Sequence, residues 1–196
     1  MVSANLIPYL GATMVAVRHV SGGIPNPQGL DMPDVLSFLS TRGNLLESYN
    51  APGVTHITNE ALLVTDTDIL IPAALENQIT VNNANDIKAK FIVEGANGPT
   101  TIEADEILEK NGVTVVPDIL ANAGGVIVSY FEWVQNIQSL VWDEDEVNKT
   151  LNRILCNAFE NVYELHKEKN IPLRTSAYAV ALKTLVRAKK ARGIFP

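Results

Sequence analysis

Three segments of the chain share one pattern of hydrophobic and polar positions. They cover residues 68–77, 91–101 and 113–125, and each begins with a short, largely β-branched apolar run. Such runs are too short for a helix and show no alternation, which is typical of parallel strands buried on both faces. Each run leads into small residues and an asparagine, and helical patterns lie between the runs. This order of elements predicts an α/β fold with a doubly wound parallel sheet.

The later part of the chain has the capping pairs and the apolar spacing of helices. A capping box at Thr100 and Glu103 predicts a helix that ends at residues 111–112. A similar pair, Asp143 and Glu146, opens a longer helix. Its apolar residues follow helical spacing and are expected to pack on the sheet or on a neighbouring domain: Val147, Leu151, Ile154, Leu155, Ala158, Phe159, Val162 and Leu165.

A last helix is expected to begin with Thr175 as its cap and to end at Gly193. Its inward face is predicted to carry Tyr178, Leu182 and Leu185.

The N-terminal part carries shorter signals. Residues 5–10 are predicted to be the end of a helix, in which Pro8 removes a hydrogen bond. Residues 13–17 form an apolar run that predicts a buried strand. Residues 21–29 consist of turn-forming residues, and Asp31 is placed to cap the helix that follows.

Composition narrows the classes of function. The net charge of −7 argues against non-specific binding to nucleic acid, which requires a cationic surface. No apolar run approaches the roughly 18 residues of a membrane span. The single cysteine, Cys156, is interpreted as a packing residue; it excludes an internal disulfide and fits a reducing cytoplasm. The histidines His19, His56 and His166 show no metal-ligand spacing.

The three strand ends are the expected position of a ligand. In an open α/β sheet, ligands bind beyond the carboxyl ends of the strands. Asn77, Asn97 and Asn122 follow the three runs, and each amide offers the donors and the acceptor that complement a carboxamide such as nicotinamide. Singly, each asparagine is as typical of a turn, and Asn97-Gly98 is a turn dipeptide. Small residues beside them leave room for a flat molecule: Ala73, Ala74, Gly95, Ala96, Ala121 and Ala123.

Six segments carry a resemblance to one family. They read "NPQGLD", "TDILIPAALEN", "VEGANGPTT", "EADEIL", "VVPDILANAGGVIVSYFEWVQN" and "RGIFP". Over nearly the whole chain they resemble the C-terminal, NAD(P)-binding domain of the Glu/Leu/Phe/Val dehydrogenases, and "GANGPTT" and "VSYFEWVQ" are more similar to the glutamate enzymes. The resemblance implies a Rossmann-like domain of a glutamate dehydrogenase, which converts glutamate to 2-oxoglutarate and ammonia while hydride passes to NAD or NADP.

The resemblance also implies roles for residues that bind the cofactor. Ala73 and Asn77 match positions that line the ribose and the nicotinamide. Gly95 and Asn97 match contacts near that ribose, and Asn122 matches the asparagine that holds the nicotinamide carboxamide.

Two further residues match the pair that closes the substrate pocket. Ser129 would hydrogen-bond the distal carboxylate of glutamate, and Val126 would pack on its methylene groups. Their three-residue spacing places both on one face of a helix. The alternative for Ser129 is a core serine that bonds to a backbone carbonyl.

The choice of cofactor is expected to depend on Arg18 and His19. The family often ends the corresponding strand with an acid, which bonds the ribose 2′-hydroxyl and repels a 2′-phosphate. Arg18 and His19 do not repel a phosphate, which favours NADP or the use of both cofactors.

The chain also departs from the family. It contains no G-x-G-x-x-G motif, so the first strand and the glycine-rich turn that holds the pyrophosphate are expected to be missing. Residues 1–140 are therefore interpreted as an incomplete dinucleotide-binding domain, and residues 141–196 as helices packed on it. The substrate domain, which carries the catalytic lysines and acid of the family, is expected to be absent as well. We expect no catalytic residue in this chain and no turnover of glutamate by the chain alone.

Two classes of function remain open. The chain is either part of a glutamate dehydrogenase, completed by an N-terminal segment, or a truncated, non-catalytic paralogue or accessory subunit that binds nucleotide weakly or joins an oligomer. A dehydrogenase for another amino acid is a less favoured third interpretation. The expected partners are glutamate or 2-oxoglutarate, together with further copies of the chain or a complementing N-terminal segment, in the cytoplasm.

Overall fold

The computed structural model describes residues 11–193. The described residues divide into two compact units, one of residues 11–68 with 86–89 and one of residues 69–85 with 90–193. The helix end predicted at residues 5–10, with Pro8, lies outside the described residues. The boundary predicted after residue 140 falls inside the second unit, and that division stays a prediction.

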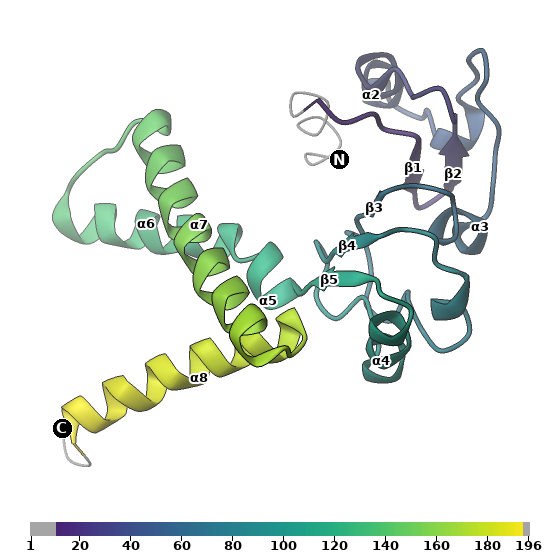
Figure 1. Ribbon diagram of the computed structural model, residues 1–196. Helices are drawn as coiled ribbons and strands as arrows, with labels where there is room; N and C mark the ends of the chain where they lie inside the picture. The colour runs from purple at the N-terminus through teal and green to yellow at the C-terminus, as the bar shows by residue number, and fades with distance from the viewer. Residues whose placement is uncertain (1–10, 194–196) are drawn as a thin grey trace. The chain divides into compact units, whose positions relative to one another are not determined.

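The first unit contains an antiparallel pair of strands, β1 (Ala16–His19) and β2 (Gly22–Pro25) (Figure 1). The buried strand predicted at residues 13–17 is wrong in extent, because β1 begins at Ala16 and is only half-buried. The prediction of turns throughout residues 21–29 is also wrong, because β2 lies within that range.

Close backbone approach explains why glycine occurs in β2. The N–H of Gly23 donates to the carbonyl of Ile57 over 3.1 Å, and a Cβ at Gly23 would lie 2.7 Å from Cδ1 of Leu62. Glycine at this position makes room for a neighbouring segment and does not mark a turn.

Short helices complete the first unit. In α2 (Met32–Ser40), Asp31 caps the first turn as predicted, and its Oδ1 accepts the N–H of Asp34 over 3.1 Å. A 3-10 helix, η2 (Leu46–Ser48), and α3 (Asn59–Leu63) follow. The core contains Ile24, Met32, Val35, Leu46 and Tyr49.

The second unit contains the predicted parallel sheet. Its order is β3 (Ile69–Leu70), β4 (Phe91–Val93), β5 (Thr114–Val116), and both pairings are parallel. The 3-10 helix η3 (Ala84–Asp86) precedes β4, and α4 (Ile102–Lys110) connects β4 to β5. The α/β class and the parallel strands predicted from the apolar runs are confirmed.

Four helices follow β5 in the second unit. They are α5 (Asp118–Ala121), α6 (Gly124–Gln138), α7 (Glu144–Lys169) and α8 (Leu173–Arg192). The predicted cap of α7 is confirmed, since Oδ1 of Asp143 accepts the N–H of Glu146 over 2.8 Å. Two predicted caps are wrong. Thr101 and not Thr100 caps α4, and Thr175 lies inside α8, which begins directly after Pro172.

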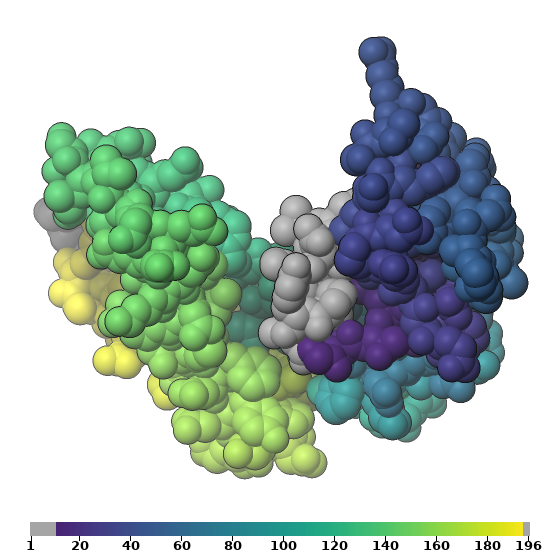
Figure 2. All heavy atoms as spheres, turned by 90° about the horizontal axis from the view of Figure 1, so that it is seen from above, coloured from purple at the N-terminus to yellow at the C-terminus, as the bar shows by residue number. Residues whose placement is uncertain are grey.

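The apolar face predicted for α7 is largely confirmed, and it packs against α5, α6 and α8. α7 lies at the surface of its unit (Figure 2), with Val162 buried and five further predicted residues half-buried: Val147, Leu151, Leu155, Ala158 and Leu165. The packing of α8 differs from the prediction. Only the first turns of α8 are buried, through Leu173, Ser176 and Ala177. The inward face predicted further along α8 is therefore wrong: Tyr178, Leu182 and Leu185 are exposed, because the neighbouring elements cover only the start of this helix. Cys156 is exposed too, so the interpretation as a packing residue is wrong.

Candidate functional site

The loops that follow β3 and β4 are bonded to each other. The N–H groups of Gly95 and Ala96 both donate to the carbonyl of Pro72, over 3.1 and 2.9 Å. A Cβ at Gly95 would lie 3.0 Å from Cβ of Ala73. Glycine is needed at residue 95 because the two loops pack this closely. The structure thus places two of the predicted site residues, Ala73 and Gly95, side by side.

Asn77 is joined to the same loops through its backbone. It adopts a left-handed conformation with φ of 52°, which asparagine tolerates better than most residues. Its N–H donates to the carbonyl of Gly98 over 2.9 Å, and its side chain is exposed. Asn77 therefore lies next to the loop that carries Asn97.

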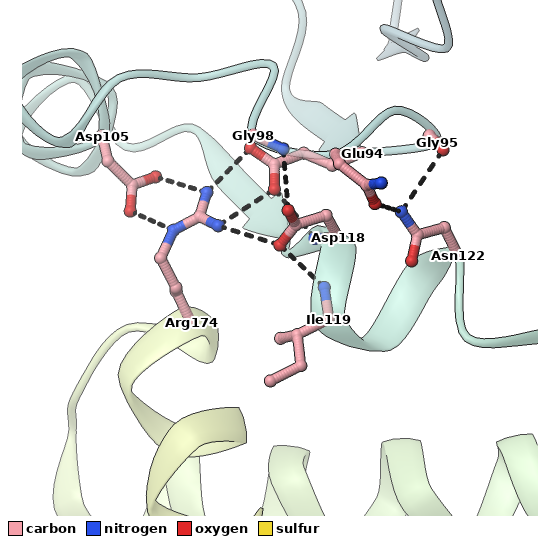
Figure 3. Close-up of polar contacts among 9 residues, drawn as sticks. Glu94, Gly95, Gly98, Asp105, Asp118, Ile119, Asn122 and Arg174 are labelled. Carbon is pink, nitrogen blue, oxygen red and sulfur yellow. Dashed lines mark hydrogen bonds and ion pairs between the residues drawn. The ribbon is translucent and has the colours of Figure 1, made fainter. Parts of the chain in front are cut away.

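The side chains of Asn97 and Asn122 are hydrogen-bonded. Nδ2 of Asn122 donates to Oδ1 of Asn97 over 2.7 Å. It also lies 3.5 Å from the carbonyl oxygen of Gly95 (Figure 3). Within residues 11–193, Oδ1 of Asn122 and Nδ2 of Asn97 have no hydrogen-bond partner. The pair therefore presents one acceptor and one set of donors, which is the complement of a primary carboxamide.

The predicted substrate residues lie on α6. Val126 is 77% exposed, and Ser129 is exposed one turn further along the helix. Ser129 is thus accessible to a ligand and does not lie in the core. Gly124, which begins α6, packs against α7, where Cδ1 of Leu155 lies 3.9 Å from the position of an added Cβ.

A charged network lies beneath these loops, and the sequence analysis missed it. Arg174 at the start of α8 makes a bidentate pair with Glu94, with Nη2 2.7 Å from Oε1 and Nη1 3.0 Å from Oε2 (Figure 3). Its Nε donates to Oδ2 of Asp105 over 2.7 Å, and its Nη1 lies 3.5 Å from Oδ1 of Asp118. One signal was present in the sequence. Glu94 directly follows an apolar strand, and a buried acid requires a partner.

The environment of Arg174 favours its charged form. Burial, the largest single influence, lowers the pKa of the guanidinium. The hydrogen bonds and charges of Glu94 and Asp105 outweigh burial, so the pKa is raised above its ordinary value. Arg174 is a permanent cation for this cluster.

Arg18 and His19 belong to the first unit, at the end of β1. Nδ1 of His19 is buried and has no hydrogen-bond partner within residues 11–193. The following residue, Val20, is exposed.

Across residues 11–193, no helix is both long and apolar enough to cross a bilayer. No group of three or more His, Cys, Asp or Glu side chains there is arranged to hold a metal ion.

A family model described as Glutamate/Leucine/Phenylalanine/Valine dehydrogenase matches residues 1–193. The chain belongs to this family. It is 50% identical over 187 residues to a glutamate dehydrogenase of Thermotoga maritima, covering 95% of this chain and 44% of that protein. It is 48% identical to an NADP-specific glutamate dehydrogenase of Halobacterium salinarum, covering 100% of this chain and 46% of the relative.

Further comparisons give the same family. A cryptic catabolic NAD-specific glutamate dehydrogenase of Bacillus subtilis is 44% identical, covering 97% of this chain and 44% of the relative. The hetero-hexameric glutamate dehydrogenase of Thermus thermophilus, in a leucine-bound form, superimposes with a TM-score of 0.87 at 31% identity, over 98% of this chain and 45% of that one. The predicted Rossmann-like fold is confirmed, and the chain spans less than half the length of these family members.

Proposed function

We propose that this chain is the dinucleotide-binding part of an NAD(P)-dependent glutamate dehydrogenase, and that its second unit binds the nicotinamide end of the cofactor. The hydrogen-bonded pair of Asn97 and Asn122 is the observation that carries this proposal. Because the pair leaves Oδ1 of Asn122 and Nδ2 of Asn97 open, it can bind both polar atoms of the nicotinamide carboxamide at once. Because Gly95 and Ala73 are small, a flat ring and its ribose can approach the backbone there, and Asn77 borders this position.

Substrate would bind along α6. Ser129 would donate its hydroxyl hydrogen to the distal carboxylate of glutamate, and Val126 would contact the methylene groups. The bound cofactor supplies a hydride acceptor, and the residues of this chain orient the two reactants. The loops and the start of α6, residues 72–77, 94–98 and 117–129, contain no Lys or His. The groups that polarise the substrate and move its protons would therefore have to come from other polypeptide, and the chain alone would not turn over glutamate.

The choice between NAD and NADP is a separate proposal that concerns the first unit. Arg18 and His19 at the end of β1 carry no negative charge that would repel a 2′-phosphate. Relatives of both specificities belong to the family, and these two residues favour NADP or the use of both cofactors.

Association with further polypeptide is supported by exposed apolar side chains. Leu182 and Leu185 on α8 are 59% and 65% exposed. Large exposed apolar surface is typical of an interface. We infer that this surface binds the N-terminal part that the longer relatives possess, or further copies of the chain.

Binding of reduced dinucleotide to the purified chain tests the proposal. Titration with NADH and with NADPH, followed by cofactor fluorescence and by calorimetry, is expected to give saturable binding that Asn122→Asp weakens. A chain that is folded by circular dichroism but binds neither dinucleotide would contradict the proposal. Tighter binding of NAD(H) than of NADP(H) would contradict only the role given to Arg18 and His19.

A further inference from the structure

Arg174 uses its whole guanidinium group on carboxylates from three other elements. Nη1 and Nη2 bind the two oxygens of Glu94, directly after β4, while Nε and Nη2 bind Asp105 on α4 over 2.7 and 3.3 Å. The remaining donor of Nη1 faces Asp118 at the start of α5, 3.5 Å away. Arg174 is separated from Glu94 by 80 residues in sequence. It thus joins the start of α8 to the loops that follow two neighbouring parallel strands.

Two of the carboxylates that contact Arg174 also bind backbone N–H groups. Oε2 of Glu94 accepts the N–H of Asp118 over 2.8 Å as well as Nη1 of Arg174. Oδ2 of Asp118 accepts the N–H of Gly98 over 2.8 Å, and its Oδ1 accepts the N–H of Ile119 over 2.7 Å (Figure 3). The residue before Gly98 is Asn97, and α5 leads to Asn122. Asn97 and Asn122 are therefore each within a few residues of a backbone hydrogen bond that belongs to this network.

The network requires an arginine. Glu94 is 0% exposed, and a buried carboxylate without a counter-charge either takes up a proton or draws its segment toward water. Arg174 is 23% exposed at its side chain and contacts both oxygens of Glu94 while it also contacts Asp105. A lysine ammonium supplies the charge but not the planar fork, so it cannot make this set of bonds together.

We propose that Arg174 is a positioning residue for dinucleotide binding: through Glu94 and Asp118 it fixes the loop of Asn97 and the start of α5, and so holds Asn97 and Asn122 in the geometry that binds a carboxamide. The proposal rests on the proposed function, in which that pair contacts the cofactor. Arg174 itself touches neither reactant.

The test compares Arg174→Lys and Arg174→Met with two matched controls in the full 196-residue chain. Arg187→Lys changes an exposed arginine on the same helix. Val162→Ala removes buried methyl groups from the core that holds Leu120 of α5 and Leu173 of α8, so it lowers the melting temperature and loosens the packing of the same elements, while every bond of Arg174 is kept. Dissociation constants for NADH and NADPH are measured well below each melting temperature. Both Arg174 variants are expected to bind about tenfold or more weakly, because small displacements of positioned groups are costly. The controls are expected to bind as the unsubstituted chain does.

A second readout needs no ligand. In 15N-resolved NMR spectra, hydrogen exchange at the amides of Gly98 and Asp118 is expected to accelerate in both Arg174 variants, and the side-chain amide signals of Asn122 are expected to shift. Val162→Ala is expected to leave these signals in place. If Arg174→Met does not fold, Arg174→Lys retains the charge and carries the test.

The outcomes separate the two proposals. If the unsubstituted chain binds dinucleotide and Arg174→Lys binds equally well, the role of Arg174 is overturned and the proposed function stands. If Val162→Ala loses as much affinity as Arg174→Lys at equal stability, Arg174 acts only through stability, and the positioning role is again overturned. If the unsubstituted chain binds no dinucleotide, the proposed function fails and the positioning role fails with it.

Discussion

Asn122 donates to Asn97 over 2.7 Å, although the two residues are 25 positions apart and follow different strands. The bond exists because parallel strands end at one edge of the sheet, so the loops after β4 and β5 meet there. It orients both amides before any ligand arrives, and such preorganisation reduces the entropy cost of binding.

Asn122→Asp is expected to break this pair. A carboxylate oxygen would replace Nδ2 and would face Oδ1 of Asn97, so two acceptors would repel. We expect affinity for NADH and NADPH to fall about tenfold, equivalent to ~1.4 kcal/mol, with little change in stability because the pair is exposed. Asn82→Asp, in an exposed loop of the same unit, adds the same charge away from the pair. Equal affinity losses in the two variants would assign the effect to charge alone.

Gly95→Ala is expected to separate the loops after β3 and β4. The new Cβ would lie 3.0 Å from Cβ and 3.4 Å from Cα of Ala73, so one of the two backbones must move. We expect the free energy of unfolding in urea to fall by about 1–3 kcal/mol. Gly125→Ala is the control, because an added Cβ there meets nothing within 4 Å. In a helix, this substitution stabilises by up to about 1 kcal/mol. A loss of stability in the control comparable to that of Gly95→Ala would contradict the steric explanation.

The parts of the structure that depend on local sequence were predictable. Apolar runs located β3, β4 and β5, and side-chain chemistry located the caps at Asp31 and Asp143. The strand ends indicated Asn77, Asn97 and Asn122 as ligand-site residues, and the resemblance to the dehydrogenases supplied their roles together with Val126 and Ser129.

The parts that depend on distant contacts were not predictable in the same way. The residues of β2 predict turns, because the sequence does not reveal that Gly23 pairs with Ile57. Arg174 looked like an ordinary helix residue, since its partners lie 69 and 80 positions away. The exposed face of α8 has a helical apolar pattern, and that pattern does not specify what covers it.

Alkaline pH is expected to destabilise the first unit through Tyr49. Its hydroxyl donates to Oδ2 of Asp34 over 2.6 Å, and burial together with that bond and the charge of Asp34 raises the pKa of Tyr49 to about 12. Tyrosine in the unfolded chain titrates near pH 10. Between about pH 10 and 12 the unfolded state therefore loses a proton that the folded state keeps, so stability falls as pH rises. The stabilisation is complete below the lower of these values.

Tyr49→Phe checks this assignment. At pH 8 we expect the variant to lose about 1–2 kcal/mol of unfolding free energy, from the missing hydrogen bond to a carboxylate. Urea titrations of both proteins between pH 8 and 11 should show a steeper decline for the unsubstituted chain. Parallel declines would show that other groups cause the alkaline sensitivity.

Catalysis is expected only when the chain is completed. The purified chain should form no NADH or NADPH from glutamate, because residues 72–77, 94–98 and 117–129 provide no lysine or histidine at the proposed site. A chimaera that joins the N-terminal part of the 50% identical Thermotoga relative to this chain should be active in a spectrophotometric assay.

In that chimaera, Ser129→Ala is expected to raise KM for glutamate more than it lowers kcat, because the hydroxyl is proposed to bind the distal carboxylate in both the ground state and the transition state. Ser40→Ala, at the exposed end of α2, controls for the loss of a hydroxyl elsewhere. Strong glutamate-dependent activity of the chain alone would contradict the proposal that the catalytic groups come from other polypeptide. An unchanged KM in Ser129→Ala would contradict the role of Ser129.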